Sequence, residues 1–199
     1  MGEIKMKVWI KALLVLVIVI FTIKVSAYAV SGTWQPAFAM HSGSMKPNMY
    51  TGDVILIQSP HRTNITTCED GERLNYKSFN DYGDVIIYHP YGSFHRIPIL
   101  HRAMYWVEEG EPMWANGSPA AYAGYITKGD NNRIIDQETS ISKLKPVKPE
   151  WIIGVARVRI PFMGYLLSGI CGTLLIYAVI YATIIGYLLR RKRKFLNPK

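Results

Sequence analysis

Cysteine is scarce in this 199-residue chain, which contains only two. Two cysteines exclude a disulfide-rich scaffold and any zinc site that needs three or four thiolates. Charged residues make up only 19% of the chain and hydrophobic residues make up 49%. This balance excludes an intrinsically disordered protein, and a length near 200 residues favours one folded domain.

Acidic residues are also scarce, with 14 against 23 basic ones and a net charge of +9. The basic excess lies at the two ends of the chain. Residues 1–30 carry four lysines and one glutamate, and residues 190–199 carry six basic residues and no acid. Residues 31–159 hold 13 residues of each sign and are neutral. A nucleic-acid-binding protein would spread basic residues over a folded face, whereas basic flanks are typical of membrane segments.

Charge is absent from two apolar stretches, Ala12–Ile23 and residues 160–189. About 20 apolar residues span a bilayer as a helix, so we expect one transmembrane helix within residues 1–30 and another over residues 166–189. A cleavable secretory signal peptide is the alternative for the first stretch. Its small-x-small cleavage site would be Ala27-Tyr28-Ala29.

The positive-inside rule predicts that both basic ends, including the tail after the second helix, are cytoplasmic. Residues 31–165 would then form an extracytoplasmic domain. Glycosylation sequons at Asn64 and Asn116 fit an exported domain. Cys68 falls in this domain and Cys171 falls in the second apolar segment, so we expect no intrachain disulfide.

The exported segment has short runs rich in β-branched and aromatic residues, several of them next to Gly-Asp turn signals. We therefore expect an all-β domain, either a sandwich or a partly open barrel. Residues 60–80 and 108–120 are polar and irregular, which predicts surface loops. The five expected strands are Val54–Gln58, Val85–Tyr88, Ile97–Val107, Tyr122–Thr127 and Trp151–Val158.

Metal-binding histidine patterns and phosphate-binding glycine loops are absent, so we expect no metal and no cofactor. A serine nucleophile needs a base that titrates near neutrality and an acid that orients it. Ser44 in a glycine-containing turn, His101, and the acids Asp130 and Asp136 supply these residue types. From the residues alone, a turn serine and a structural histidine are the simpler interpretation, and spacing does not separate His101 from His95.

Four segments in order resemble the sequence boxes of type I signal peptidases. Residues 41–55, with Ser42-Gly43-Ser44-Met45 at their centre, are similar to the nucleophile box. Residues 83–102 resemble the general-base box of the archaeal and endoplasmic-reticulum branch, which has histidine where bacterial members have lysine. Residues 126–136 are similar to the acidic box, and residues 153–165 resemble the closing strand of the family.

The resemblance implies a signal-peptidase-like β fold between two transmembrane helices. It also implies a membrane-bound serine endopeptidase that removes N-terminal signal peptides after small residues at positions −1 and −3. Preprotein signal peptides and the lipid bilayer are the partners it implies, with the Sec translocon as a further candidate and no nucleic acid.

In this family the matching residues would act as follows. Ser44 would be the nucleophile and His101 the general base. Asp136 would be the triad acid, with Asp130 as the rival for the contact with His101, and both acids are expected to contribute to catalysis. The backbone N–H of Ser44 and the hydroxyl of Ser42 would form the oxyanion hole.

Some alternatives stay open. The lysines at positions 46 and 128 are rival bases, as in a Ser–Lys dyad. A non-catalytic scaffold subunit on the same fold is a second hypothesis, and a self-processing membrane serine peptidase that cuts near Ala27-Tyr28-Ala29 is a third. The membrane is either an archaeal plasma membrane or an endoplasmic reticulum, and the second apolar segment with its basic tail favours the archaeal one.

Overall fold

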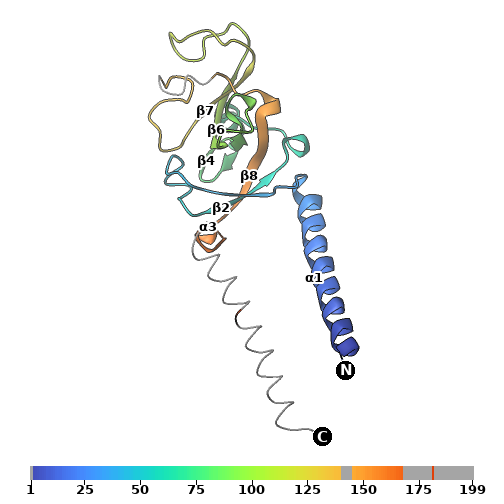
Figure 1. The fold of residues 1–199 in the computed structure, drawn as a ribbon. Coiled ribbons are helices and arrows are strands. Elements are labelled where there is room, and N and C mark those ends of the chain that lie inside the picture. Colours follow the sequence, from blue (N-terminus) through green and yellow to red (C-terminus); the bar gives the residue numbers. More distant parts are fainter. Residues whose placement is uncertain (1, 140–144, 168–180, 182–199) are drawn as a thin grey trace.

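One antiparallel sheet organises the part of the chain that the computed structural model describes, residues 2–139, 145–167 and 181 (Figure 1). The sheet has six strands in the order β1-β2-β8-β5-β6-β7. Every neighbouring pair runs antiparallel. The strands are β1 (Ala37–Ala39), β2 (Val54–Gln58), β5 (Val85–Tyr88), β6 (Ile99–Val107), β7 (Gly124–Lys128) and β8 (Ile152–Ile160).

Smaller elements surround this sheet. A second, two-stranded sheet is formed by β3 and β4. Among the described residues, three further helical elements are single 3₁₀ turns. The bounds are η1 (Pro60–Arg62), α2 (Cys68–Leu74), β3 (Lys77–Ser78), β4 (Asp81–Tyr82), η2 (Pro90–Gly92), η3 (Pro149–Trp151) and α3 (Met163–Leu167).

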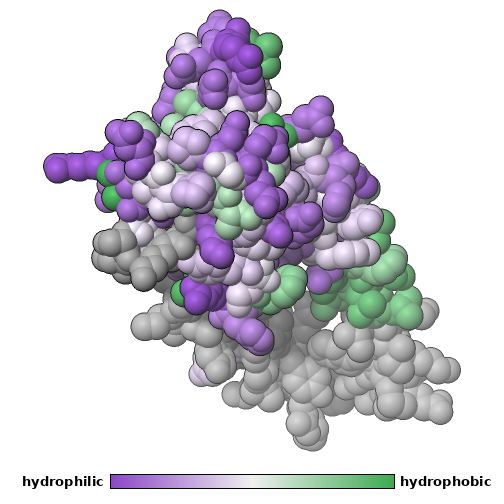
Figure 2. All heavy atoms as spheres, turned by 90° about the horizontal axis from the view of Figure 1, so that it is seen from above, coloured by the Kyte–Doolittle hydropathy of each residue, from purple (hydrophilic) through white to green (hydrophobic). Residues whose placement is uncertain are grey.

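The helix α1 (Gly2–Ser31) projects from the β domain in Figure 1. Its Leu14–Ser31 stretch has a mean hydropathy of 2.3 and is only 6% buried. This helix is therefore long and apolar enough to cross a membrane. In Figure 2, seen from the upper end of Figure 1, the β domain is mainly hydrophilic, and the main hydrophobic patch lies on the side where Figure 1 places α1. The second expected transmembrane helix falls almost wholly on residues outside the described part of the chain.

The mostly β architecture agrees with the sequence prediction, and the five expected strands are present within two residues at either end. The main sheet is open, with β1 and β7 at its edges. The edge strand β1 was not predicted, because three residues are too few to display an alternating pattern.

The prediction of a loop over residues 60–80 is wrong. This region contains η1, the helix α2 and β3, the first strand of the small β3–β4 hairpin. Local polar bonds define α2: the Thr67 side chain accepts a hydrogen bond from the Asp70 backbone N–H, and Asn75 ends the helix in the left-handed conformation. A seven-residue helix of mostly polar residues has no apolar stripe to reveal it.

The second expected loop, residues 108–120, has no regular strand, as predicted, but it is not merely a surface segment. Its Met113 and Ala120 are buried and form a hydrophobic cluster with Val107 and Ile126 of the neighbouring strands. The loop therefore covers one end of the sheet.

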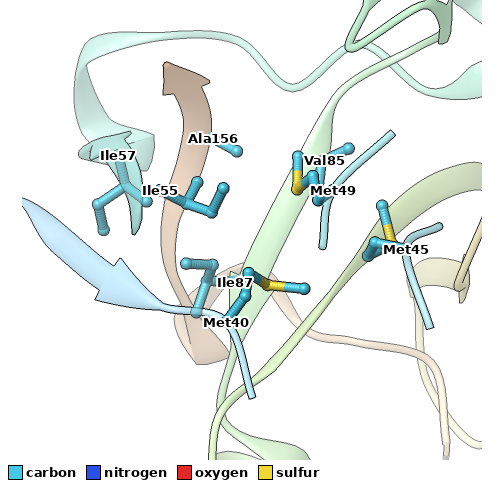
Figure 3. Close-up of a cluster of buried hydrophobic side chains, with 8 residues drawn as sticks. All are labelled: Met40, Met45, Met49, Ile55, Ile57, Val85, Ile87 and Ala156. Carbon is cyan, nitrogen blue, oxygen red and sulfur yellow. The ribbon is translucent and has the colours of Figure 1, made fainter. Parts of the chain in front are cut away.

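The main core lies under the segment that joins β1 to β2. Figure 3 shows three methionines of this segment, Met40, Met45 and Met49, packed with apolar side chains of β2, β5 and β8. Met45 and Met49 are completely buried. Burying a side chain of this size contributes about 1.5–3 kcal/mol, so these residues fix the loop that carries Ser44.

Candidate active site

Ser44 lies in the turn between β1 and β2, directly before the buried Met45. The Met49 backbone N–H donates to the Met45 carbonyl at 2.9 Å, which closes one helical turn after the serine. This turn holds Met45 in the core and leaves Ser44 only partly buried. The serine hydroxyl therefore stands at the edge of a fixed loop.

His101 comes from the sheet, near the start of β6. Its Nε2 atom lies 3.0 Å from the Ser44 hydroxyl oxygen, and its Nδ1 atom lies 2.5 Å from Oδ2 of Asp136. His101 is 9% exposed and Asp136 is 4% exposed. The structure thus brings serine, histidine and aspartate into one line of contacts, in which the acid is shielded from water and the serine is accessible.

Two further hydroxyls converge on the same carboxylate oxygen. Thr127 of β7 donates to Oδ2 of Asp136 at 2.7 Å, and Tyr88 at the end of β5 donates at 3.2 Å. Burial and the neighbouring carboxylate hold the pKa of Tyr88 well above its usual range, so its hydroxyl stays a donor. Hydrogen bonds to the carboxylate orient it toward His101.

Ser42 stands on the other side of the nucleophile. Its hydroxyl oxygen lies 3.1 Å from that of Ser44, and its side chain is exposed. This position fits the oxyanion role that the resemblance implies, because a hydroxyl here faces the same solvent space as the serine.

Asp130, the expected rival acid, does not occupy the position next to His101. Its two carboxylate oxygens accept hydrogen bonds from Nε and Nη2 of Arg102, at 2.9 and 2.8 Å. The Arg102 and Asp130 side chains are only 2% and 5% exposed. Arg102 also donates to the backbone carbonyls of Ser78 and Gly83, so the pair ties β6 to the β3–β4 region.

The turn that carries Asp130 touches the nucleophile directly. The Asn131 backbone N–H donates to the Ser44 carbonyl at 2.8 Å. A Cβ atom on Gly129 would lie 2.7 Å from that carbonyl and 3.0 Å from Nε2 of His101. Only glycine allows this approach, so Gly129 and its neighbours set the distance between the serine and the histidine.

A groove of about 810 Å³ opens beside the Ser44–His101 pair. It runs along β1 and is bordered on the other side by the segment that leads into β6. Its apolar lining includes Phe38, Met40, Ile87, Ile97 and Leu100.

Other residues considered from the sequence lie elsewhere. His95 is exposed in the segment before β6, so it is outside the strand that carries His101. Lys46 is exposed, and its amine lies 5.9 Å from the centre of the Tyr50 ring. Sequence reasoning gave no role to Tyr88 or Thr127, because a strand tyrosine or threonine looks the same whether or not it meets a distant carboxylate.

No family model matches the chain. Two fungal proteins named signal peptidase complex catalytic subunit SEC11 are similar to it. The one from Schizophyllum commune strain H4-8 is 27% identical over 143 residues, which cover 68% of this chain and 65% of that protein. The one from Saccharomyces cerevisiae strain YJM789 is 27% identical over 134 residues, which cover 66% of this chain and 63% of that protein.

This chain is similar to signal peptidase catalytic subunits. It spans a little under two thirds of the length of these curated relatives. The likeness favours the endoplasmic-reticulum branch of the signal peptidases. Because the relatives are fungal, they give no support to the archaeal membrane that the second apolar segment favoured.

Proposed function

We propose that this chain is a membrane-bound signal peptidase, a serine endopeptidase that removes N-terminal signal peptides from exported preproteins. The observation that carries the proposal is the line of contacts from the Ser44 hydroxyl through His101 to the buried Asp136. Nucleophile, base and orienting acid in hydrogen-bond reach are what acyl transfer by a serine requires. The complete set argues against a non-catalytic scaffold.

In this mechanism, Nε2 of His101 takes the Ser44 proton as the hydroxyl oxygen attacks the scissile carbonyl. The same proton then passes to the leaving amine, and a water molecule activated by His101 hydrolyses the acyl-enzyme. Asp136 accepts a hydrogen bond from Nδ1 of His101, which sets the tautomer and stabilises the imidazolium. Tyr88 and Thr127 keep the carboxylate in place for both half-reactions.

The backbone N–H of Ser44 and the Ser42 hydroxyl would stabilise the oxyanion of the tetrahedral intermediate. One such donor contributes about 10²–10³-fold in rate. Because the Ser42 hydroxyl is within 3.1 Å of the nucleophile oxygen, a modest rotation of its side chain directs it at an attacked carbonyl.

The groove supports an extended substrate. The edge strand β1 pairs with β2 on one side, and its other side faces this groove. A peptide in extended form can add to such an edge, and its alternate side chains then enter the groove while the others point away. Positions −1 and −3 share one face, in keeping with the small residues that the resemblance implies there.

The apolar and exposed α1 supports attachment of this domain to a membrane, where signal peptides also reside. We propose that the β domain lies on the extracytoplasmic side with both chain ends cytoplasmic, and that the Sec translocon delivers the substrates. The name of the relatives, as catalytic subunits of a signal peptidase complex, supports preproteins as the substrate class.

Cleavage of a purified preprotein in detergent tests the proposal. Ser44→Ala and His101→Ala should abolish release of the mature protein. Ser118→Ala and His61→Ala, two exposed residues of the same types away from the groove, should retain the wild-type rate. Full activity in Ser44→Ala would show that another group performs the reaction.

A further inference from the structure

The end of α1 carries a sequence that would be a substrate for the proposed activity. Ala27-Tyr28-Ala29 has small residues at −3 and −1 relative to the Ala29–Val30 bond. This bond is not hidden: Ala29 is exposed, and the Val30 side chain is 80% exposed. Packing against the described part of the protein therefore does not protect it from a peptidase of its own kind.

The backbone around this bond is instead held in a helix. A helix normally leaves its last four carbonyls without partners in the helix. Here the Gly32 backbone N–H donates at 2.8 Å to the carbonyl of Tyr28, the first of these four, and the Ser31 hydroxyl donates at 2.7 Å to the carbonyl of Ala27 just before them. An extended peptide in a groove needs these groups free.

The carbonyl that would be attacked, that of Ala29, is held from outside the helix. Nη1 of Arg62 in η1 donates to it at 2.5 Å. The guanidinium also lies 5.8 Å from the centre of the Tyr28 ring, which stacks on Trp34 with 4.4 Å between ring centres. Arg62 thus contacts two of the three residues of the cleavage sequence.

Two more contacts fix Arg62 and the helix end in this arrangement. Gly32 has a φ of +74°, the left-handed conformation that ends many helices, and a Cβ atom there would lie 2.6 Å from Cδ and Nε of Arg62. The Ser59 backbone N–H donates to the Ser31 carbonyl at 2.7 Å. The segment around η1 therefore caps α1 as a unit.

We propose that Arg62 protects this protein against cleavage by other copies of itself, by holding the Ala29 carbonyl in the helix. This inference rests on the proposed function. In the reaction it prevents, Ser44 of one copy forms an ester with the Ala29 carbonyl carbon of another as the bond to the Val30 nitrogen breaks. His101 passes the serine proton to that nitrogen, and water then hydrolyses the ester to restore Ser44 and free the Ala29 carboxylate.

The test uses full-length chains that carry Ser44→Ala as substrates and the wild-type protein as enzyme, in detergent. Adding Arg62→Ala to the substrate should speed cleavage about 10-fold, since a hydrogen bond from a charged donor is lost, and the product should begin at Val30. Arg73→Ala, another exposed arginine that pairs with Asp70 away from α1, should leave the parent rate unchanged. Ala29→Phe together with Arg62→Ala should block cleavage.

Gly32→Ala is a second way to loosen the cap, because its Cβ atom would displace the Arg62 side chain. It should also speed cleavage at the Ala29–Val30 bond. An elastase that cuts after small residues provides a readout that does not depend on this chain's own activity. It should cut the Ser44→Ala, Arg62→Ala chain faster at the same bond than the Ser44→Ala parent.

The outcomes separate this inference from the proposed function. If wild-type protein cleaves a preprotein in the same tube but cuts the Arg62→Ala chain no faster than its parent, the protective role is wrong and the function stands. If the preprotein is not cleaved, the proposed function fails. If elastase then cuts the Ser44→Ala, Arg62→Ala chain no faster than the Ser44→Ala parent, the claim that Arg62 holds the end of α1 also fails. Purified wild-type protein that already begins at Val30 would also overturn the inference.

Discussion

The substitutions Asp136→Ala and Asp130→Ala should impair the protein in different ways. Removing Asp136 leaves His101 without an orienting carboxylate, which costs about 10⁴-fold in kcat in Ser–His–Asp enzymes. The Arg102 side chain is only 2% exposed, and removing Asp130 leaves its guanidinium buried without a carboxylate partner. Breaking a buried pair in this way destabilises a fold by about 3–5 kcal/mol. For a chain of this size that corresponds to a fall in Tm of about 6–20 °C.

Thermal unfolding followed by circular dichroism, together with preprotein cleavage below the unfolding range, measures both effects. Asp136→Ala should remain folded and almost inactive, whereas Asp130→Ala should have a much lower Tm and a smaller loss of kcat per folded molecule. Arg102→Met with Asp130→Leu is the matched control, because replacing both charges by apolar groups should recover much of the lost Tm. An Asp130→Ala protein with wild-type Tm, or an Asp136→Ala protein with a tenth of wild-type kcat, would refute these assignments.

Three further predictions concern Tyr88 and Gly129, which support the site, and the thiol of Cys68. Tyr88→Phe removes one of the donors to the acid's carboxylate and should lower kcat several-fold with KM unchanged. Because burial raises the pKa of Tyr88, the wild-type pH–rate profile should show no loss of this donor up to pH 9. Gly129→Ala should lower kcat by about 10²-fold in steady-state assays with a much smaller change in Tm, since its Cβ atom would press on the Ser44 carbonyl and on His101. Burial, with nearby acidic side chains, raises the pKa of the Cys68 thiol, so less thiolate is present at pH 8. Alkylation of the Cys68 peptide, followed by mass spectrometry, should be slower in the folded protein than after denaturation, and equal rates would contradict this.

Local signals in the sequence predicted much of the fold. The runs that became β2 and β5 have the predicted bounds, because β-branched residues next to Gly-Asp turns define buried strands over a few residues. The helix α2 and the strand β1 were missed, since the first depends on a Thr67 cap and the second on pairing with β2. Neither effect appears in the hydrophobic pattern of the chain.

The sequence by itself determined the distribution of charge, the apolar stretch of α1, and a short list that contained one serine, one favoured histidine and two acids. Only the tertiary structure decided how the acids divide. Asp130 and Asp136 are close in the chain, but the turn after β7 directs the first to Arg102 and the second to His101. Side chains that follow a turn take directions set by contacts with distant strands, and those contacts exist only once the sheet has formed.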